Sequence, residues 1–320
     1  MTQTTMITAG IDTAKDKLDV AVHGQASTTT FANTPDGWNR LAAQLAKAGV
    51  QRIGIEATGG YERGVTRHLQ ANGFIVVVLQ PLQVKAFAKL HLRRAKNDRL
   101  DAILIAACTV ALDARNAMPP DPRFDELGDH LTFIEQIEDD IARFKTRIQH
   151  IADKRRLRVV AADIARLETR RTAELKRLTA ALCVHADLAR RFDLVLSIPG
   201  IGERTTLALV IRMPELGQLS REEAAALAGL APFVHQSGKH VGETHIGDGR
   251  ARLRRSLYAA ALPASFRWNP ALIELYKRLT KRGKTHKSAL VACARKLLVF
   301  ANTVVHRGNP WQDSAALSAS

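Results

Sequence analysis

The N-terminal third of the chain alternates between short apolar runs and longer amphipathic ones, and this order limits the possible folds most. Alternating residues predict a hairpin at 6–22 and a third strand at 28–31, after which Thr34 and Pro35 start a helix. Apolar strands follow at 52–57 and 74–79, each succeeded by a helix. Strands that alternate with helices favour a mixed α/β sheet with helices on its faces.

Beyond this region the pattern becomes helical. The Pro-rich run at 118–122 is the strongest break in the chain, and we place a domain boundary there. From about 125 to 190 Gly and Pro almost vanish and apolar residues recur at helical spacing, with an unclear break near 155–158. We therefore expect four parts: a sheet domain at 1–118, a helical or coiled-coil arm at 119–192, a mainly helical domain at 193–307 and a disordered tail at 308–320.

The charge of the chain points to a polyanionic partner. Lys and Arg number 47 against 31 Asp and Glu, a formal net charge of +16. The excess is uneven, because residues 141–180 hold twelve basic and four acidic residues and residues 267–296 hold nine basic and one acidic. An excess of this size and distribution predicts nucleic acid as the partner.

The cysteines and the apolar runs indicate the compartment. Cys108, Cys183 and Cys293 are far apart and show no metal-binding or redox spacing, so we expect small buried residues in a reducing environment. The N-terminus lacks the features of a secretory signal, and no stretch approaches the ~18 apolar residues of a membrane span. We therefore expect a cytoplasmic protein without a membrane partner.

Four acidic residues fall where a sheet of this order would bring them together. Asp12 ends the first strand, Glu56 ends the fourth, and Asp98 and Asp101 lie three residues apart at the start of a helix with an apolar stripe. Taken alone, the last two are typical of a solvated helix face. In a ribonuclease-H-like sheet, however, acids at these four positions would gather at one place.

Four carboxylates at one place require a cation. Two like charges about 4 Å apart repel by roughly 4 kcal/mol at an effective dielectric constant of about 20. Oxygen-only ligands suit magnesium, or manganese, and a pair of such ions can activate the attacking oxygen and stabilise the leaving oxygen in phosphodiester chemistry. Asp16 and Asp19, two other acids of the first hairpin, are interpreted as surface charges.

The segment LSIPGIGERTTLALVIRMPELG has the form of a helix-hairpin-helix, with a helix expected to start near Glu203 or Arg204. Gly200 and Gly202 would let a backbone phosphate approach the N–H groups at that helix start. The alternative is an ordinary tight turn between two core helices. The basic charge of the chain favours the phosphate contact.

Ser237 lies in a glycine-rich stretch that we expect to form a loop, and composition alone gives it little weight. Basic residues follow it closely in the sequence: Lys239, Arg250, Arg252, Arg254 and Arg255. These cations would clamp a phosphodiester around a nucleophile, and Arg252 and Arg255 can share one helix face. Ser197 and Ser256 are rival serines.

Three histidines surround Ser237 in the sequence, namely His235, His240 and His245. Their spacing places them on no common helix or strand face, and no cysteine joins them. We interpret them as loop side chains near phosphates, with one of them assisting Ser237 as the alternative.

The pieces GIDTAKDKLDVAV, GIEATGGYER and AKNDRLDAILIA resemble the RuvC-like domain of the DEDD transposases of bacterial insertion sequences, the bridge-RNA-guided recombinases. LAGLAPFVHQSGKHVG resembles the C-terminal transposase motif of the same family, and KSALVACARKLLVFANTVV resembles its closing helix. The resemblance covers residues 6–306, although the helical middle matches in character more than in residues.

This resemblance implies a set of roles. The metal-binding acids would be Asp12, Glu56, Asp98 and Asp101, and Ser237 would be the nucleophile that forms a covalent phosphoserine link with DNA. An element-encoded RNA would pair with donor and target DNA. The protein would be a homo-oligomer, a dimer or tetramer, in which the acid domain of one subunit meets the serine of another.

The sequence therefore predicts a DNA transposase or recombinase. A first alternative is a metal-dependent, junction-resolving endonuclease in which the four acids hydrolyse DNA with water and Ser237 only holds a phosphate. A second is a non-catalytic nucleic-acid-binding protein in which the acids are surface charge.

Overall fold

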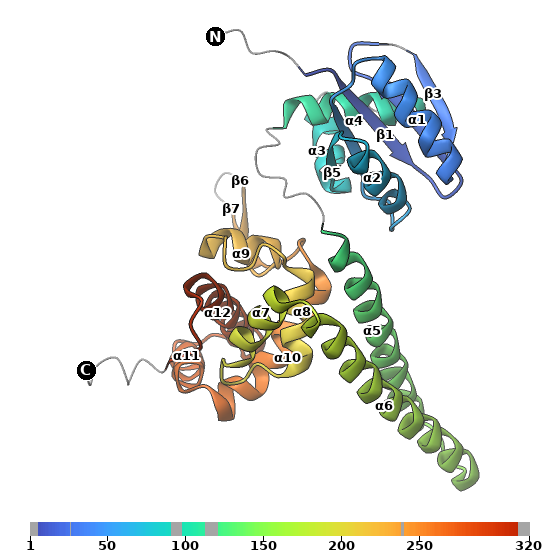
Figure 1. Cartoon of the computed structure of the whole chain (residues 1–320). Coiled ribbons are helices and arrows are strands. Elements are labelled where there is room, and N and C mark those ends of the chain that lie inside the picture. The colour runs from blue at the N-terminus through green and yellow to red at the C-terminus, as the bar shows by residue number, and fades with distance from the viewer. Residues whose placement is uncertain (1–5, 26, 91–97, 113–120, 238–239, 313–320) are drawn as a thin grey trace. The chain divides into compact units, whose positions relative to one another are not determined.

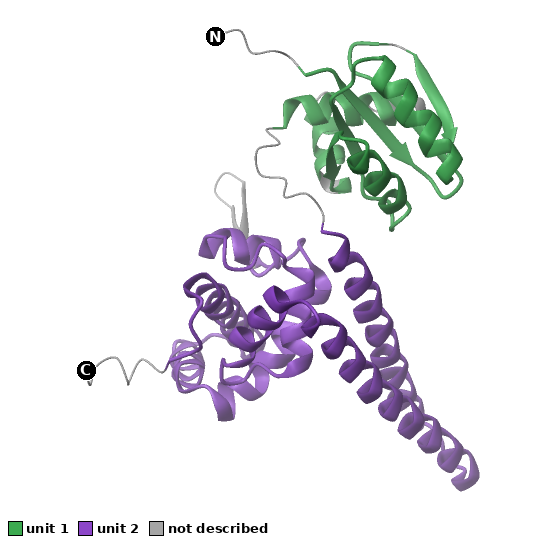
Figure 2. Ribbon diagram, viewed as in Figure 1, with its two compact units in different colours: residues 1–120 green, residues 121–320 purple. Residues whose placement is uncertain are grey.

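The chain forms two compact units, residues 1–120 and 121–320, in a computed structural model (Figures 1 and 2). The structure describes residues 6–25, 27–90, 98–112, 121–237 and 240–312. Within these ranges, the side chains of residues 82, 98–100, 233–237 and 240–244 are not described. The helical arm expected as a separate part belongs to the second unit by its packing.

A five-stranded mixed sheet forms the centre of the first unit, with the strand order β3-β2-β1-β4-β5. Its strands are β1 (Thr8–Thr13), β2 (Lys17–Val22), β3 (Thr28–Ala32), β4 (Arg52–Glu56) and β5 (Ile75–Leu79). β1 pairs antiparallel with β2 and parallel with β4, while β2–β3 is antiparallel and β4–β5 parallel. The mixed α/β sheet predicted from the element order is confirmed, and its order is consistent with a ribonuclease-H-like domain.

Helices line both faces of this sheet, namely α1 (Pro35–Lys47), α2 (Glu62–Ala71), α3 (Pro81–Leu90) and α4 (Asp98–Ala111). Because side chains alternate along a strand, each face has its own core. Ile11 and Ile53 belong to the core that Leu41 of α1 and Leu69 of α2 complete. On the opposite face, side chains of β5, α3 and α4 form a second core: Val77, Leu79, Val84, Leu104, Ile105 and Cys108.

Two glycines allow α4 to lie directly on the sheet. Gly10 of β1 and Gly54 of β4 are register partners on neighbouring strands. A Cβ atom on Gly10 would overlap the backbone of α4 at Ala102 and Ala106, and one on Gly54 would overlap the Thr109 side chain. The helix therefore sits closer to β1 and β4 than any side chain at these two positions permits.

The second unit begins with two long helices, α5 (Pro122–Ile148) and α6 (Lys154–Cys183), which lie side by side as a helical hairpin (Figure 1). The break between them falls at 149–153, slightly before the predicted position, and Asp153 caps α6 by accepting a hydrogen bond from the Arg156 N–H at 2.9 Å. Lys145 and Glu168 form an ion pair of 2.8 Å across the hairpin. Leu131 and Leu178 anchor its base in the core of the unit.

Further helices complete this core, with a β-hairpin inserted among them. The elements are α7 (Ala186–Leu196), α8 (Glu203–Arg212), α9 (Arg221–Leu227), β6 (Phe233–Ser237), β7 (His240–His245), α10 (Ala251–Pro263), the π-helix η2 (Ala264–Trp268), α11 (Pro270–Lys281) and α12 (His286–Arg307). The predicted helix start near Glu203 or Arg204 is confirmed by α8.

Among the described residues, α12 is the one helix long and apolar enough to cross a membrane, contrary to our expectation that no stretch approaches this limit. Half of its apolar stretch is buried inside the unit, where Leu297, Leu298 and Ala301 join the core. This burial is typical of the central helix of a globular core.

The ordered C-terminus extends further than predicted. Gly308, with φ 67°, caps α12 in the left-handed conformation. Beyond it, the rings of Trp311 and Phe300 lie 4.6 Å apart, and the Trp311 N–H donates to Ser197 Oγ at 2.8 Å. The start of the predicted disordered tail at Gly308 is therefore too early, because Trp311 packs against α12. Residues 313–320 lie outside the described part of the chain.

The close packing of α4 predicts an effect of replacing Gly10. In Gly10→Ala the new methyl group overlaps backbone atoms of α4, so the free energy of unfolding should fall by about 1–3 kcal/mol. The matched control is Gly128→Ala in α5, whose Cβ would meet only Ile211 Cγ2 at 3.9 Å. That change should be neutral or stabilise by about 0.5–1 kcal/mol. Urea unfolding of the full chain measures both; equal stabilities would contradict the packing.

Candidate active site

The orientation of α4 decides where its acids lie. Arg52 Nη2, at the start of β4, donates to the Leu112 carbonyl, just past the end of α4, at 2.8 Å. The C-terminal end of α4 therefore lies at the starting edge of β4. Its first turn, with Asp98 and Asp101, must lie toward the opposite edge, where β1 and β4 end.

Asp12 and Glu56 are positioned at that same edge and on the face that α4 covers. Asp12 follows Gly10 by two residues and Glu56 follows Gly54 by two, so each carboxylate shares the face of the glycine before it. Burial raises the pKa of the Cys108 thiol in α4, and the charge of Glu56 raises that pKa further, so Glu56 lies within electrostatic range of the helix. We define Asp12, Glu56, Asp98 and Asp101 as the acid edge.

The chemistry of the acid edge fits magnesium or manganese, because all four donors are carboxylates. Among the side chains that the structure describes, no three acidic, Cys or His groups form a ready metal cluster. The Asp98 side chain lies outside this description, although the start of its helix is described. The metal-binding role of the four acids remains a prediction.

Asp19 corrects our interpretation of the first hairpin. It is only 7% exposed and lies directly opposite Asp12 in the β1–β2 register. Lys17 Nζ lies 2.9 Å from its carboxylate, and Thr30 Oγ1 donates to it at 2.6 Å. Asp19 is therefore a buried, paired neighbour of the acid edge, whereas Asp16 is exposed as expected. Its position between Leu18 and Val20 in an apolar strand was the available sequence signal.

Ser237 is the last residue of β6 and pairs with His240 of β7. The glycine-rich stretch therefore forms a β-hairpin where we expected a loop, because apolar and β-branched residues flank the turn on both strands. The structure describes the backbone of Ser237 and not its side chain, and Lys239 lies outside the described residues. The nucleophilic role of Ser237 thus remains a prediction.

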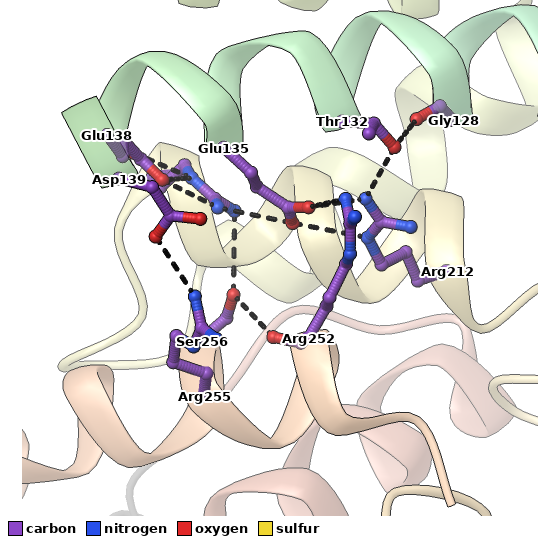
Figure 3. Close-up of polar contacts among 10 residues, drawn as sticks. Gly128, Thr132, Glu135, Glu138, Asp139, Arg212, Arg252, Arg255 and Ser256 are labelled. Carbon is purple, nitrogen blue, oxygen red and sulfur yellow. Dashed lines mark hydrogen bonds and ion pairs between the residues drawn. The ribbon is translucent and has the colours of Figure 1, made fainter.

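The arginines that follow this hairpin are engaged within the second unit, and Figure 3 shows two of them, Arg252 and Arg255. Glu135 of α5, 8% exposed, is the centre of the network. Its carboxylate lies 2.7 Å from Arg212 of α8, 2.7 Å from Arg252 of α10 and 3.4 Å from Arg204 of α8. We call these four residues the Glu135 network. Glu135 of α5 therefore joins its own helix to α8 and α10.

The other three arginines also have partners. Arg250 makes two hydrogen bonds to Glu215, of 2.7 and 2.8 Å. Burial opposes ionisation of Glu215, but Arg250 outweighs it, so the pKa of Glu215 lies below its usual value. Arg254 donates to the Gly229 and Asp248 carbonyls, and Arg255 lies 3.2 Å from Asp139. To contact a phosphodiester, these arginines would have to bind it in addition to their protein partners or in place of them.

Next to the Glu135 network lies a cavity of about 210 Å³ whose lining includes Arg204, Arg255 and Ser256. Ser256 Oγ donates to the Arg252 carbonyl at 3.3 Å, and Ser197 Oγ donates to the Leu194 carbonyl at 2.7 Å. Both rival serines are therefore hydrogen-bonded within their own helical region.

The Pro-Gly-Ile-Gly turn serves two purposes. Gly200, with φ +94°, lies against Ala264 of η2, so a side chain there would collide with the core. Gly202 is exposed and precedes α8, with nothing within 4 Å of where its Cβ would lie. The tight-turn alternative accounts for Gly200, while Gly202 keeps an open helix start. A role of either glycine in nucleic-acid binding remains a prediction.

The sheet order of the first unit is consistent with a ribonuclease-H-like domain of the DEDD type. A DEDD family model described as a transposase matches residues 9–155. A second model, described as the transposase IS116/IS110/IS902 family, matches residues 192–277. The chain belongs to this family of insertion-sequence transposases, and it is a DNA transposase or recombinase.

Similar proteins support this placement. The chain is 29% identical over 312 residues to the pilin gene-inverting protein of Moraxella bovis, covering 94% of this chain and 96% of the relative. The pilin gene-inverting protein of Moraxella lacunata matches with the same identity and coverage. An insertion element IS110 uncharacterized 43.6 kDa protein of Streptomyces coelicolor is 34% identical over 102 residues, 31% of this chain and 25% of that protein.

The Glu135 network predicts an asymmetric effect of two neighbouring substitutions. Glu135→Gln leaves three arginine charges without their buried carboxylate and should lower the free energy of unfolding by about 1–3 kcal/mol. The matched control is Glu138→Gln, whose side chain is 30% exposed and, within the described residues, pairs with Arg204 alone. It should change stability by less than about 1 kcal/mol. Urea unfolding compares the two, and equal losses would rule out Glu135 as the centre of the network.

Proposed function

We propose that the chain cuts and rejoins DNA strands through a covalent intermediate on Ser237, assisted by metal ions held at the acid edge. The observation that supports this most strongly is the shared location of Asp12, Glu56 and the first turn of α4 at one edge and face of the sheet. The name of the Moraxella relatives, pilin gene-inverting proteins, describes a DNA rearrangement of this kind.

The chemistry assigned to Ser237 conserves the energy of the phosphodiester bond. The serine oxygen attacks the phosphorus, a new O–P bond forms, and the bond to the leaving deoxyribose oxygen breaks. The proton of the serine hydroxyl passes in net terms to that leaving oxygen. In the reverse step a hydroxyl of the new strand displaces the serine. Magnesium or manganese, when bound, would stabilise the negative charge that develops on the phosphate.

We further propose that the protein uses an element-encoded structured RNA that pairs with donor and target DNA. The net charge of +16 and the basic stretch of α6 suit a partner read through its backbone and shape. We also propose a homo-oligomer, a dimer or tetramer, in which coiled-coil contacts of the α5–α6 arms join subunits. We also propose that the segment before α8 acts as a helix-hairpin-helix, in which the N–H groups at the helix start contact a nucleic-acid phosphate.

The covalent intermediate is tested by capture on a denaturing gel. The wild-type protein, cognate RNA, magnesium and labelled element-end DNA should give a protein–DNA adduct. Ser237→Ala should abolish the adduct, because it removes the attacking oxygen. Asp12→Ala, or a chelator in place of magnesium, should reduce it strongly. The matched control is Ser256→Ala, which removes a serine in the same unit and should leave the adduct intact.

The contrary result would identify the hydrolytic alternative. DNA cleavage that persists in Ser237→Ala but disappears in Asp12→Ala would mean that water is the nucleophile and that Ser237 only holds a phosphate. Loss of the adduct in Ser256→Ala with retention in Ser237→Ala would mean that Ser256 is the nucleophile and that our assignment of Ser237 is wrong.

The charge of the chain predicts a steep salt dependence of DNA binding. Neutralising six to ten phosphates would lower the affinity by about 10³–10⁵ between roughly 50 and 200 mM salt, because bound counterions are released. Fluorescence anisotropy with labelled duplex DNA measures this slope. A slope near zero would show that the phosphate charges of DNA contribute little to binding. It would contradict the assignment of nucleic acid as the partner of this basic chain.

A further inference from the structure

An exposed group of aromatic rings lies on the second unit at η2. Phe266 and Trp268 are each 53% exposed, which is unusual for two large apolar side chains so close in sequence. Tyr276 of α11 and His286 of α12 lie beside Phe266. We call these four residues the aromatic surface.

Three rings of the aromatic surface are held in a defined arrangement, those of Phe266, Tyr276 and His286. The centroids of Phe266 and Tyr276 lie 4.8 Å apart, and those of Tyr276 and His286 lie 5.8 Å apart, edge to face. The Tyr276 hydroxyl lies 2.7 Å from His286 Nδ1. The Arg267 guanidinium lies 4.8 Å from the centre of the Trp268 ring. A planar ligand would therefore meet preorganised rings with a cation beside them.

The backbone beneath these rings is anchored. Phe266 and Trp268 lie on a π-helical turn, a conformation frequent at functional sites. Asn269, fully buried, donates to the Pro199 carbonyl at 3.1 Å and accepts from the Leu272 N–H at 3.2 Å. Ala264, at the other end of the turn, packs against Gly200. The two exposed rings thus stand on a backbone fixed at both ends.

Exposed cations lie on the same stretch of the chain as the aromatic surface. Residues 267–296 hold nine basic and one acidic residue. The exposed ones are Arg267, Lys277, Arg278, Lys281, Arg282, Lys284, Lys287 and Lys296. Within the described part of the chain, no ion pair joins any of them to a carboxylate, unlike Arg250, Arg252 and Arg255. These cations are therefore available to phosphates without first breaking an ion pair.

We propose that the aromatic surface binds unpaired bases of a single DNA strand, which stack on Phe266 and Trp268 while the exposed cations contact the phosphates. Bases of an intact duplex are already stacked and would not fit these rings. A second copy of this surface would bring like charges together. Exchange of strands between duplexes frees bases from pairing, and it is the class of reaction that this family performs. The inference depends on neither Ser237 nor a guide RNA.

Binding of a labelled short oligodeoxythymidine to the full-length protein, followed by fluorescence anisotropy, tests this assignment. Trp268→Ala should weaken binding by about 5- to 150-fold, the loss expected for one stacked base. Trp268→Phe retains a ring and should restore most of the affinity. Affinity for a duplex of the same length should change less than about twofold, because its phosphate contacts remain.

Phe133→Ala is the matched control, because Phe133 is 36% exposed on α5 and has the Arg170 guanidinium 5.1 Å from its ring centre. It should bind the oligodeoxythymidine like the wild type. Phe266→Ala provides a second test if Trp268→Ala does not fold, as judged by circular dichroism, and should also weaken binding to the single strand selectively.

Other outcomes would overturn the proposal. Equal losses on single-stranded and duplex DNA would mean that the aromatic surface supports phosphate contacts only. Unchanged binding in both folded variants would exclude stacking. A loss confined to oligouridine, with oligodeoxythymidine unaffected, would assign the surface to RNA. A change in sedimentation from oligomer to monomer, without a change in binding, would assign it to a contact between copies.

Discussion

The close contact between α4 and the sheet at Gly10 and Gly54 is the constraint on which the first unit depends. The two glycines are register partners on neighbouring strands and carry no side chains. Ala102, Ala106 and Thr109 of α4 can therefore lie directly against the strand backbone. The helix cannot shift along the strands without collision, so the distance from this level to the strand ends is fixed. The positions of the backbone at the acid edge follow from that contact.

A different kind of interaction organises the second unit. Glu135 joins three helices through arginine pairs, and Arg250 and Glu215 add another pair beside it. Such pairs, once partly buried, favour one arrangement of helices because separating them leaves charges unsatisfied. The unit thus uses three partly buried arginines, Arg204, Arg212 and Arg250, together with the more exposed Arg252, for assembly. Many of its exposed cations lie on α6 and on the stretch of the chain that carries the aromatic surface.

The element order and the acid positions could be predicted because both depend on local patterns. Alternation defined β1 and β2, and the ends of β1 and β4 placed Asp12 and Glu56. The pairing of Asp19 with Lys17 and Thr30 depends on strand register, which a turn of uncertain length does not fix. Glu135, the partner of Arg252, lies 117 residues away in the sequence. No local sequence pattern therefore indicated that this arginine is used for packing.

The acid edge and Ser237 differ in how the fold supports them, and this difference matters for mechanism. The backbone of the acid edge belongs to the ends of β1 and β4 and to the first turn of α4, which packs on the sheet, so it is positioned before any ligand binds. Ser237 ends a strand of a two-stranded hairpin, and such a ribbon depends on its surroundings for stability. In the proposed mechanism, bound DNA is therefore the partner best able to fix the serine relative to the phosphate, while the carboxylates would need only a cation to offset their mutual repulsion.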